Sequence, residues 1–136
     1  MAYALLSVGL LGLLVFLLGA NVSRKRHSIT VTQHEAEADP NSTLRKAIRA
    51  HGNCIEYVPM LSLMILALGL RLPLMPLWIA ALMLTAVASR YVHAIGILTG
   101  GSVYEANALK SIGAIGTYLT GAVLSVILVV RAVALF

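Results

Sequence analysis

This sequence has little charge, a single cysteine and no recognisable metal-binding pattern. Asp, Glu, Lys and Arg make up only 11% of its 136 residues, whereas soluble domains average roughly 25%. The lone Cys54 excludes an internal disulfide and every paired-cysteine motif. The four histidines are scattered without the spacing of metal ligands, so we expect no metal site. These absences exclude a disulfide-stabilised secreted domain and leave the composition of a membrane protein.

Long apolar segments occupy most of the chain. Hydrophobic residues account for 60% of it, and four segments approach the roughly 20 residues that a helix needs to cross a bilayer. Each segment must be helical, because a strand exposed to lipid would leave backbone groups unpaired. We therefore predict an all-α membrane protein: one domain over residues 1–136 that forms a four-transmembrane-helix bundle. The predicted helices cover residues 2–22, 43–71, 74–98 and 108–132.

Polar and helix-breaking residues mark the ends of these helices. No basic residue precedes the first apolar segment, which is also longer than the core of a signal peptide, so we expect a retained helix. Pro40-Asn41-Ser42 predicts the start of the second helix, with Asn41 or Ser42 as its N-cap. Pro73 and Pro76 are expected to break the chain in a tight turn before the third helix.

The basic residues predict the orientation in the membrane. Six of the ten Lys and Arg residues lie between the first and second helices, and the next connection holds only Arg71. The positive-inside rule then places the first and third connections in the cytoplasm and both termini outside. The short chain, which carries no retention signal, favours a bacterial inner membrane. The net charge of +5 is thus a topology signal, and we expect no nucleic-acid partner.

A group of polar residues lies where a membrane helix usually avoids them. Arg49, Asn53 and Glu56 follow the spacing i, i+4, i+7 and share one face of the second helix. Arg90 and His93 are three residues apart on the third helix. Counting from the outer turn places Glu56 and Arg90 at nearly the same depth, towards the cytoplasmic end. These five residues are therefore predicted to form one cluster that faces the bundle interior or a wet cavity.

The cluster has a structural and a functional interpretation. A Glu56–Arg90 ion pair could simply lock two helices together, and His93 could be a packing residue. However, the five side chains exceed what one pair needs, and their net positive charge suits an anionic, peptide-like ligand with carboxylates. Cys54 points about 200° away from Glu56 and is expected to pack. Tyr57 could flank the site or pack, and no catalytic residue is assigned.

Small residues recur at every fourth position of the predicted fourth helix. The series is Gly113, Thr117, Gly121 and Ser125. Such a ladder allows helices to approach closely. We interpret it as a packing surface, which could lie between subunits.

The polar motif of the second helix resembles a family signature. The pattern R-A-H-x-N-x-x-E that begins at Arg49, followed by Pro59, resembles that of the MAPEG family, the membrane-associated proteins in eicosanoid and glutathione metabolism. Arg90-x-x-His93 resembles a second family element. The layout of four spans and the long first connection also agree, so the resemblance covers essentially the whole chain.

The resemblance implies a binding site and an assembly. Family members are homotrimers that hold glutathione between neighbouring subunits near the cytoplasmic side. The positions that match glutathione contacts are Arg49, Asn53, Glu56, Arg90 and His93. Arg24 or Arg26 could match a further basic residue at the end of the first helix. The implied activity is that of a glutathione transferase or peroxidase acting on lipophilic electrophiles or lipid hydroperoxides that arrive from the membrane lipid.

Two departures from the family pattern favour a second hypothesis. Ile97 stands where several catalytic members carry a tyrosine. Catalytic members also present an arginine near the start of the fourth helix, which lowers the pKa of the glutathione thiol. Residues 99–109 of this chain contain no arginine. Lys110 is the nearest cation, and Tyr104 could offer a hydroxyl. The alternative is therefore a non-catalytic trimeric membrane binding or scaffold protein. A small multidrug exporter is disfavoured, because such exporters usually place their glutamate in the first helix, which is uncharged here.

Overall fold

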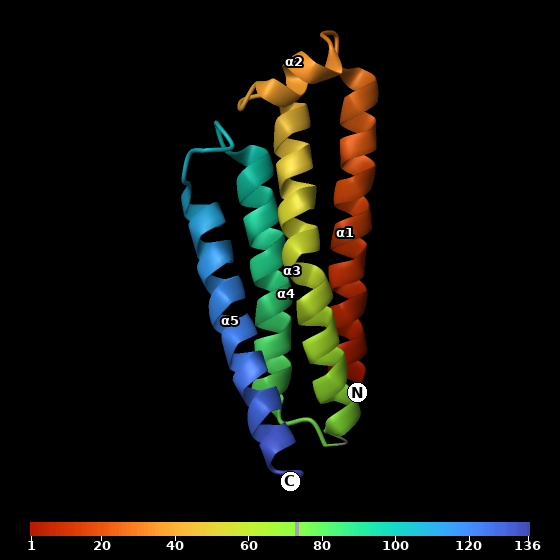
Figure 1. Ribbon diagram of the computed structural model, residues 1–136, viewed down its shortest axis with the longest axis vertical. Helices are drawn as coiled ribbons and strands as arrows, with labels where there is room; N and C mark the ends of the chain where they lie inside the picture. Colours follow the sequence, from red (N-terminus) through yellow and green to blue (C-terminus); the bar gives the residue numbers. More distant parts are fainter. Residues whose placement is uncertain (73) are drawn as a thin grey trace.

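Four long helices stand side by side in a bundle, and a short helix covers one end (Figure 1). The computed structural model describes residues 1–72 and 74–136. The elements are α1 (Ala2–Ser28), α2 (Gln33–Ala38), α3 (Thr43–Arg71), α4 (Leu77–Thr99) and α5 (Ala108–Val133). All four long helices are long and apolar enough to cross a membrane. The predicted all-α, four-helix membrane fold is therefore confirmed.

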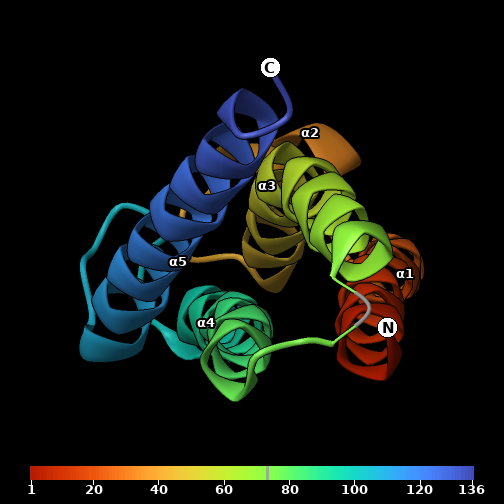
Figure 2. The ribbon, with the colours of Figure 1, turned by 90° about the horizontal axis from the view of Figure 1, so that it is seen from below.

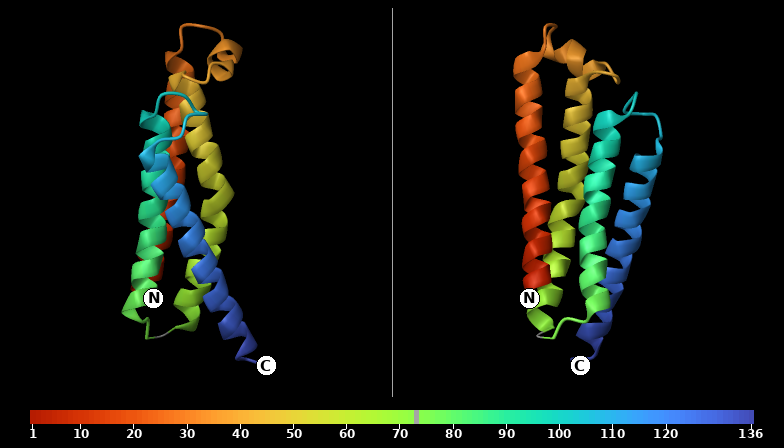
Figure 3. Two further views of the ribbon diagram at one scale, coloured as in Figure 1. Left: turned by 90° about the vertical axis from the view of Figure 1, so that its left-hand side faces the viewer. Right: turned by 180° about the vertical axis from the view of Figure 1, so that it is seen from behind.

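The bundle consists of two helix pairs that meet along a seam. α1 packs mainly on α3 and α4 mainly on α5, with fewer contacts between the pairs. Viewed along the bundle, α5 starts beside α4 and ends near the last turns of α3 (Figure 2), so it is inclined to its neighbours (Figure 3). One continuous core joins all four helices, with Leu11, Ile65, Met83 and Leu124 fully buried. In a bilayer such association depends on close packing rather than on removing apolar surface from water.

The two ends of the bundle differ in chemistry. Both termini and the α3–α4 connection lie at one end, whereas α2 and the α4–α5 connection lie at the other (Figure 1). The end with α2, called here the loop end, therefore carries the basic last turn of α1 and the basic first turns of α3. The other is called the terminal end.

Local capping explains where the helices begin and end. α3 begins after Ser42, whose hydroxyl accepts from the Arg45 backbone N–H at 3.0 Å, as expected for the predicted cap. α4 begins at Leu77, three residues later than the predicted start, because Pro76 is its N-cap; Pro73 lies outside the described residues. α1 continues to Ser28, where its basic last turn complements the negative end of the helix dipole.

The short helix α2 was not predicted from the sequence. Its N-cap Thr32 forms a capping box with Glu35: the Thr32 hydroxyl accepts from the Glu35 N–H, and the Glu35 carboxylate accepts from the Thr32 N–H at 3.0 Å. The Thr32 hydroxyl also donates to the Glu35 carboxylate at 2.7 Å. This bond, together with the one from the Thr32 N–H, lowers the pKa of the Glu35 carboxyl. Ser42 also donates to the carbonyl of Ala36, which ties α2 to the start of α3.

The small residues of α5 allow it to pack closely inside one subunit. A Cβ atom added at Gly113 would overlap the backbone of His93 on α4, and one at Gly116 would overlap Ser89. Further along the ladder, Ser125 faces α3, with its Oγ 3.1 Å from the Met64 sulfur. Within the chain the ladder is therefore a packing surface; that part of it also lies between subunits stays a prediction.

Candidate functional site

Arg90 is a buried charge at the seam between the two helix pairs. It is only 2% exposed. Its Nη2 donates to the backbone oxygen of Asn53 at 3.1 Å and to Asn53 Oδ1 at 2.7 Å. Its guanidinium carbon lies 5.1 Å from the centre of the Tyr57 ring, a cation–π contact. Among the described residues, none accepts a hydrogen bond from Arg90 Nε. Arg90 thus joins α4 to α3 and keeps one N–H unsatisfied.

The structure joins Arg90 to Asn53 rather than to Glu56, the partner suggested by depth. Glu56 is exposed. The reason is rotational, because residues follow each other at about 100° around a helix. Cys54 faces the core with 0% exposure. Asn53 lies about 100° from Cys54, on the flank of α3, and Glu56 lies about 60° farther round, nearly opposite Cys54. Depth alone placed Glu56 and Arg90 at one level of the bundle. It contained no information on which side of α3 faces α4.

Two tyrosines extend this contact to α5. The Tyr57 and Tyr118 hydroxyl oxygens are 3.2 Å apart, and their ring centres are 5.7 Å apart in a tilted arrangement. Tyr57 is half-buried, whereas Tyr118 remains 57% exposed. Asn53, Arg90, Tyr57 and Tyr118 therefore form one chain of contacts across three helices. Sequence reasoning missed Tyr118, although a tyrosine inside an apolar span signals a hydroxyl that needs a partner.

A cavity begins at this tyrosine pair and runs along α3 and α5. Its volume is about 430 Å³, and Glu56, Tyr57 and Tyr118 line it towards the loop end. Farther towards the terminal end its walls are mostly apolar, formed by side chains that include Met60, Met64 and Ala122. The cavity thus places hydroxyl groups and a carboxylate beside a space that suits a lipophilic molecule.

Three arginines surround Gly52 on the exposed side of α3. Arg45 and Arg49 line a hollow of about 180 Å³ with Gly52. Arg26 lines a neighbouring cavity of about 420 Å³ between α1 and α3, which Gly52 also borders. Arg24, by contrast, donates to Asn21 on its own helix at 3.0 Å. Of the two candidates at the end of α1, the structure therefore brings Arg26 towards the α3 motif.

His93 and Lys110 serve the packing of α4 against α5. His93 Nδ1 is 2.7 Å from the carbonyl oxygen of Lys110, within hydrogen-bond distance. The Lys110 ammonium donates to the carbonyl oxygens of Val103 and Glu105 in the α4–α5 connection. This places His93 at a helix contact, as the packing interpretation expects. It also shows that the cation nearest to residues 99–109 is occupied by its own connection.

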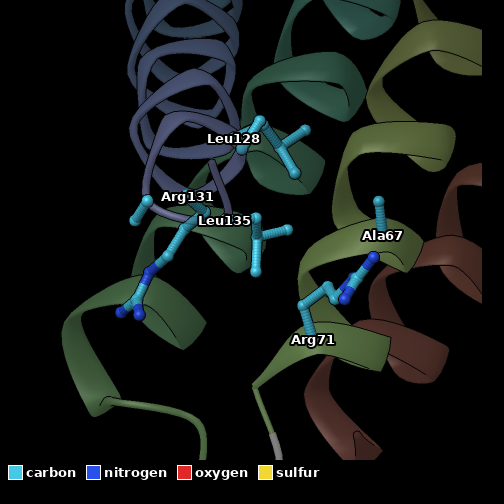
Figure 4. A pocket seen from close by; sticks show the side chains of 7 residues that line it. Ala67, Arg71, Leu128, Arg131 and Leu135 are labelled. Carbon is cyan, nitrogen blue, oxygen red and sulfur yellow. The ribbon is translucent and has the colours of Figure 1, made fainter.

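A separate cavity lies at the terminal end, far from the polar cluster. It measures about 410 Å³ and contains Arg71 of α3 and Arg131 of α5. The two side chains extend in different directions on either side of Leu135 (Figure 4). Arg71 is therefore an exposed arginine on the same helix as Arg49 but at the opposite end, which makes it a matched control for Arg49.

Comparison with known families covers almost the entire chain. The family model for the MAPEG family matches residues 4–130 of the 136. No curated protein and no solved structure matches the chain. The matched range includes the arginines around Gly52, Arg90, Glu56 and both tyrosines, whereas Arg131 and Leu135 of the terminal cavity lie outside it.

Proposed function

Because the chain belongs to the MAPEG family of membrane proteins of glutathione and eicosanoid metabolism, we propose that it binds glutathione at the loop end of α3. The observation that carries the proposal is the group of Arg26, Arg45 and Arg49 around Gly52, with Glu56 one turn beyond. Glutathione carries two carboxylates and one ammonium group. Arginines bind carboxylates through paired charge-assisted hydrogen bonds, and Glu56 suits the ammonium.

The exposure of Glu56 bears on how the protein assembles in a membrane. Its side chain is exposed in the single chain, near the middle of a 29-residue helix. A charged side chain that faces lipid costs up to roughly 2.5–3.5 kcal/mol, the value for the centre of a membrane helix, and less towards its ends. A second copy of the chain, together with the ligand, removes this contact with lipid. We therefore propose a homotrimer with one site between neighbouring subunits, on the cytoplasmic side of a bacterial inner membrane.

The proposed reaction uses the thiol of glutathione as the nucleophile. A free thiol has a pKa near 8.5 and is partly ionised at neutral pH; the surrounding arginines favour the thiolate. A lipophilic electrophile or lipid hydroperoxide enters from the bilayer along the cavity between α3 and α5. Conjugation forms a carbon–sulfur bond while the electrophile loses its leaving group or a π bond. Reduction of a hydroperoxide to the alcohol breaks the O–O bond and oxidises the thiol to the sulfenic acid. The protein thiol is not needed, since Cys54 is fully buried.

A binding role without turnover is the second candidate. It is favoured by the α4–α5 connection, which contains no arginine over residues 99–109 and whose neighbouring Lys110 is bonded to carbonyl oxygens. A protein of this kind would hold glutathione but leave its thiol without a nearby cation from α5. Turnover assays separate this role from that of an enzyme.

The test is calorimetric titration of the detergent-purified protein with glutathione. We expect saturable binding by the wild type and weakening of about ten- to a hundredfold in Arg49→Ala, the equivalent of about 1.5–3 kcal/mol for hydrogen bonds to a charged group. Arg71→Ala removes an exposed arginine from the other end of α3 and should bind normally. No binding by the wild type, or equal weakening in both variants, would contradict the proposed site.

A further inference from the structure

The Tyr57–Tyr118 pair has one hydroxyl proton that its mutual hydrogen bond does not use. Each hydroxyl can donate once, and the single contact at 3.2 Å engages only one of the two protons. Both residues line the cavity of about 430 Å³. The second proton is therefore available to an acceptor that enters this cavity, which is also lined by Glu56 of the proposed glutathione site.

The charge of Arg90 favours one of the two tyrosines as the hydrogen-bond donor within the pair. Its positive charge lies over the Tyr57 ring, 5.1 Å from the centre. A cation at this position stabilises the electron density that Tyr57 gains when it donates its proton in a hydrogen bond. Either hydroxyl could donate at this distance, and the charge of Arg90 favours Tyr57 as the donor and Tyr118 as the acceptor. The more exposed Tyr118 then offers its own proton to the cavity.

We infer that the Tyr118 hydroxyl is the group that binds the oxygen atom of a lipophilic substrate, and that conjugated enals and enones are the preferred class. This inference rests on the proposed function, because it requires glutathione as the co-substrate. Tyr118 touches the reacting molecule, whereas Tyr57 and Arg90 are positioning residues. The apolar wall that includes Met60, Met64 and Ala122 takes the alkyl chain.

The reaction is an addition in which charge develops on the carbonyl oxygen. The glutathione thiolate forms a bond with the β-carbon, the π electrons of the alkene shift towards the carbonyl group, and an enolate oxygen results. Tyr118 donates its hydrogen bond to that oxygen. The proton released when the thiol ionised is regained at the α-carbon through solvent, so the adduct is the sum of the two reactants and nothing is oxidised. Removing one such donor typically lowers kcat by roughly a hundred- to a thousandfold.

The experiment compares two electrophiles with equal alkyl chains, one with and one without an oxygen atom. A conjugated nonenal develops charge on oxygen, whereas iodononane loses iodide. For Tyr118→Phe we expect kcat/KM with nonenal to fall about a hundredfold, mainly through kcat, with iodononane changed less than about threefold. Tyr57→Phe should show a smaller loss of the same selectivity. Tyr104→Phe alters an exposed tyrosine in the α4–α5 connection and should match the wild type.

Calorimetry with glutathione on the same variants separates this inference from the proposed function. Normal glutathione binding by Tyr118→Phe together with the selective loss would support it. Equal losses with both electrophiles would overturn it, because Tyr118 would then act on the glutathione thiolate or on folding rather than on the substrate oxygen. Unchanged rates, or a wild type that binds glutathione without consuming nonenal, would overturn it and leave the glutathione site intact. A wild type that fails to bind glutathione would overturn both.

Discussion

At the scale of single residues, Arg90 holds α3 and α4 together by donating to two oxygen atoms of one residue, Asn53. A buried positive charge without acceptors is far more costly than a buried neutral amide. The two partners are therefore unequal. Loss of Asn53 Oδ1 leaves the charge of Arg90 with a single backbone acceptor, whereas loss of Arg90 removes the charge together with its bonds.

This inequality gives a prediction for stability. We expect Asn53→Leu to lower the free energy of unfolding by about 1.5–3 kcal/mol, the value typical of a hydrogen bond to a charged group, and Arg90→Met to lower it less. The double variant should lose less than the sum of the two, because the residues contact each other. Denaturant titration in detergent micelles measures all three. Strict additivity would show that the Asn53–Arg90 contact contributes nothing.

The sequence predicted part of this residue-scale picture. Arg90 and Asn53 were identified because charged and polar residues are costly in a membrane and therefore stand out in apolar spans. It did not identify the Asn53–Arg90 pairing, which depends on the rotation of α3 about its axis. It also missed Tyr118, because the sequence does not show that its hydroxyl lies next to that of Tyr57 on another helix. The assignment of all five residues to glutathione stays a prediction.

At the scale of elements, α4 and α5 lie so close that some positions accept no side chain. An alanine at Gly113 would place its Cβ against the His93 backbone, which cannot move as a side-chain tip could. Gly12 on α1 has no atom within 4 Å of the same position. The two glycines thus share a helical backbone but differ in their surroundings.

We expect opposite effects from the same substitution at these two sites. Gly113→Ala should destabilise the protein by about 1–3 kcal/mol, the usual cost of overpacking. Gly12→Ala should be neutral or stabilising by roughly 0.5–1 kcal/mol, because alanine is the better helix former. Thermal unfolding in micelles provides the comparison. A Gly113→Ala variant as stable as the wild type would mean that α5 can move away from α4 freely.

Element boundaries followed the sequence where a cap is encoded locally. Ser42 fixed the start of α3 as predicted, because its hydroxyl needs only a backbone N–H three residues later. The end of α1 was less predictable, since hydropathy marks where a helix leaves the apolar layer and not where its hydrogen bonds stop. α1 therefore continues to Ser28, past its apolar segment.

At the scale of the whole molecule, the α1–α2 and α4–α5 connections share one end and the α3–α4 connection lies at the other (Figure 1). Each connection has an exposed position: Val31 between α1 and α2, Tyr104 between α4 and α5, and Leu74 between α3 and α4. Cys54 has 0% exposure and provides a silent background for thiol labelling. The chain therefore allows a direct test of its orientation.

We expect a membrane-impermeant maleimide to label Leu74→Cys in intact bacterial cells. Val31→Cys and Tyr104→Cys should react only after permeabilisation, because the positive-inside rule places both connections in the cytoplasm. The wild type should remain unlabelled in either condition. Reaction of Val31→Cys and Tyr104→Cys from different sides of the membrane would contradict the arrangement of the four spans.

The division into two helix pairs bears on how the chain enters the membrane during synthesis. α4 carries Arg90 and His93, and an arginine at a helix centre costs roughly 2.5–3.5 kcal/mol on insertion. α5 follows immediately and packs along α4, so leaving the translocon as a hairpin covers part of this polar surface. Asn53 belongs to the pair that is synthesised first. We therefore expect the amide that accepts from Arg90 to be in the bilayer before the arginine arrives, and the seam between the two pairs to close last.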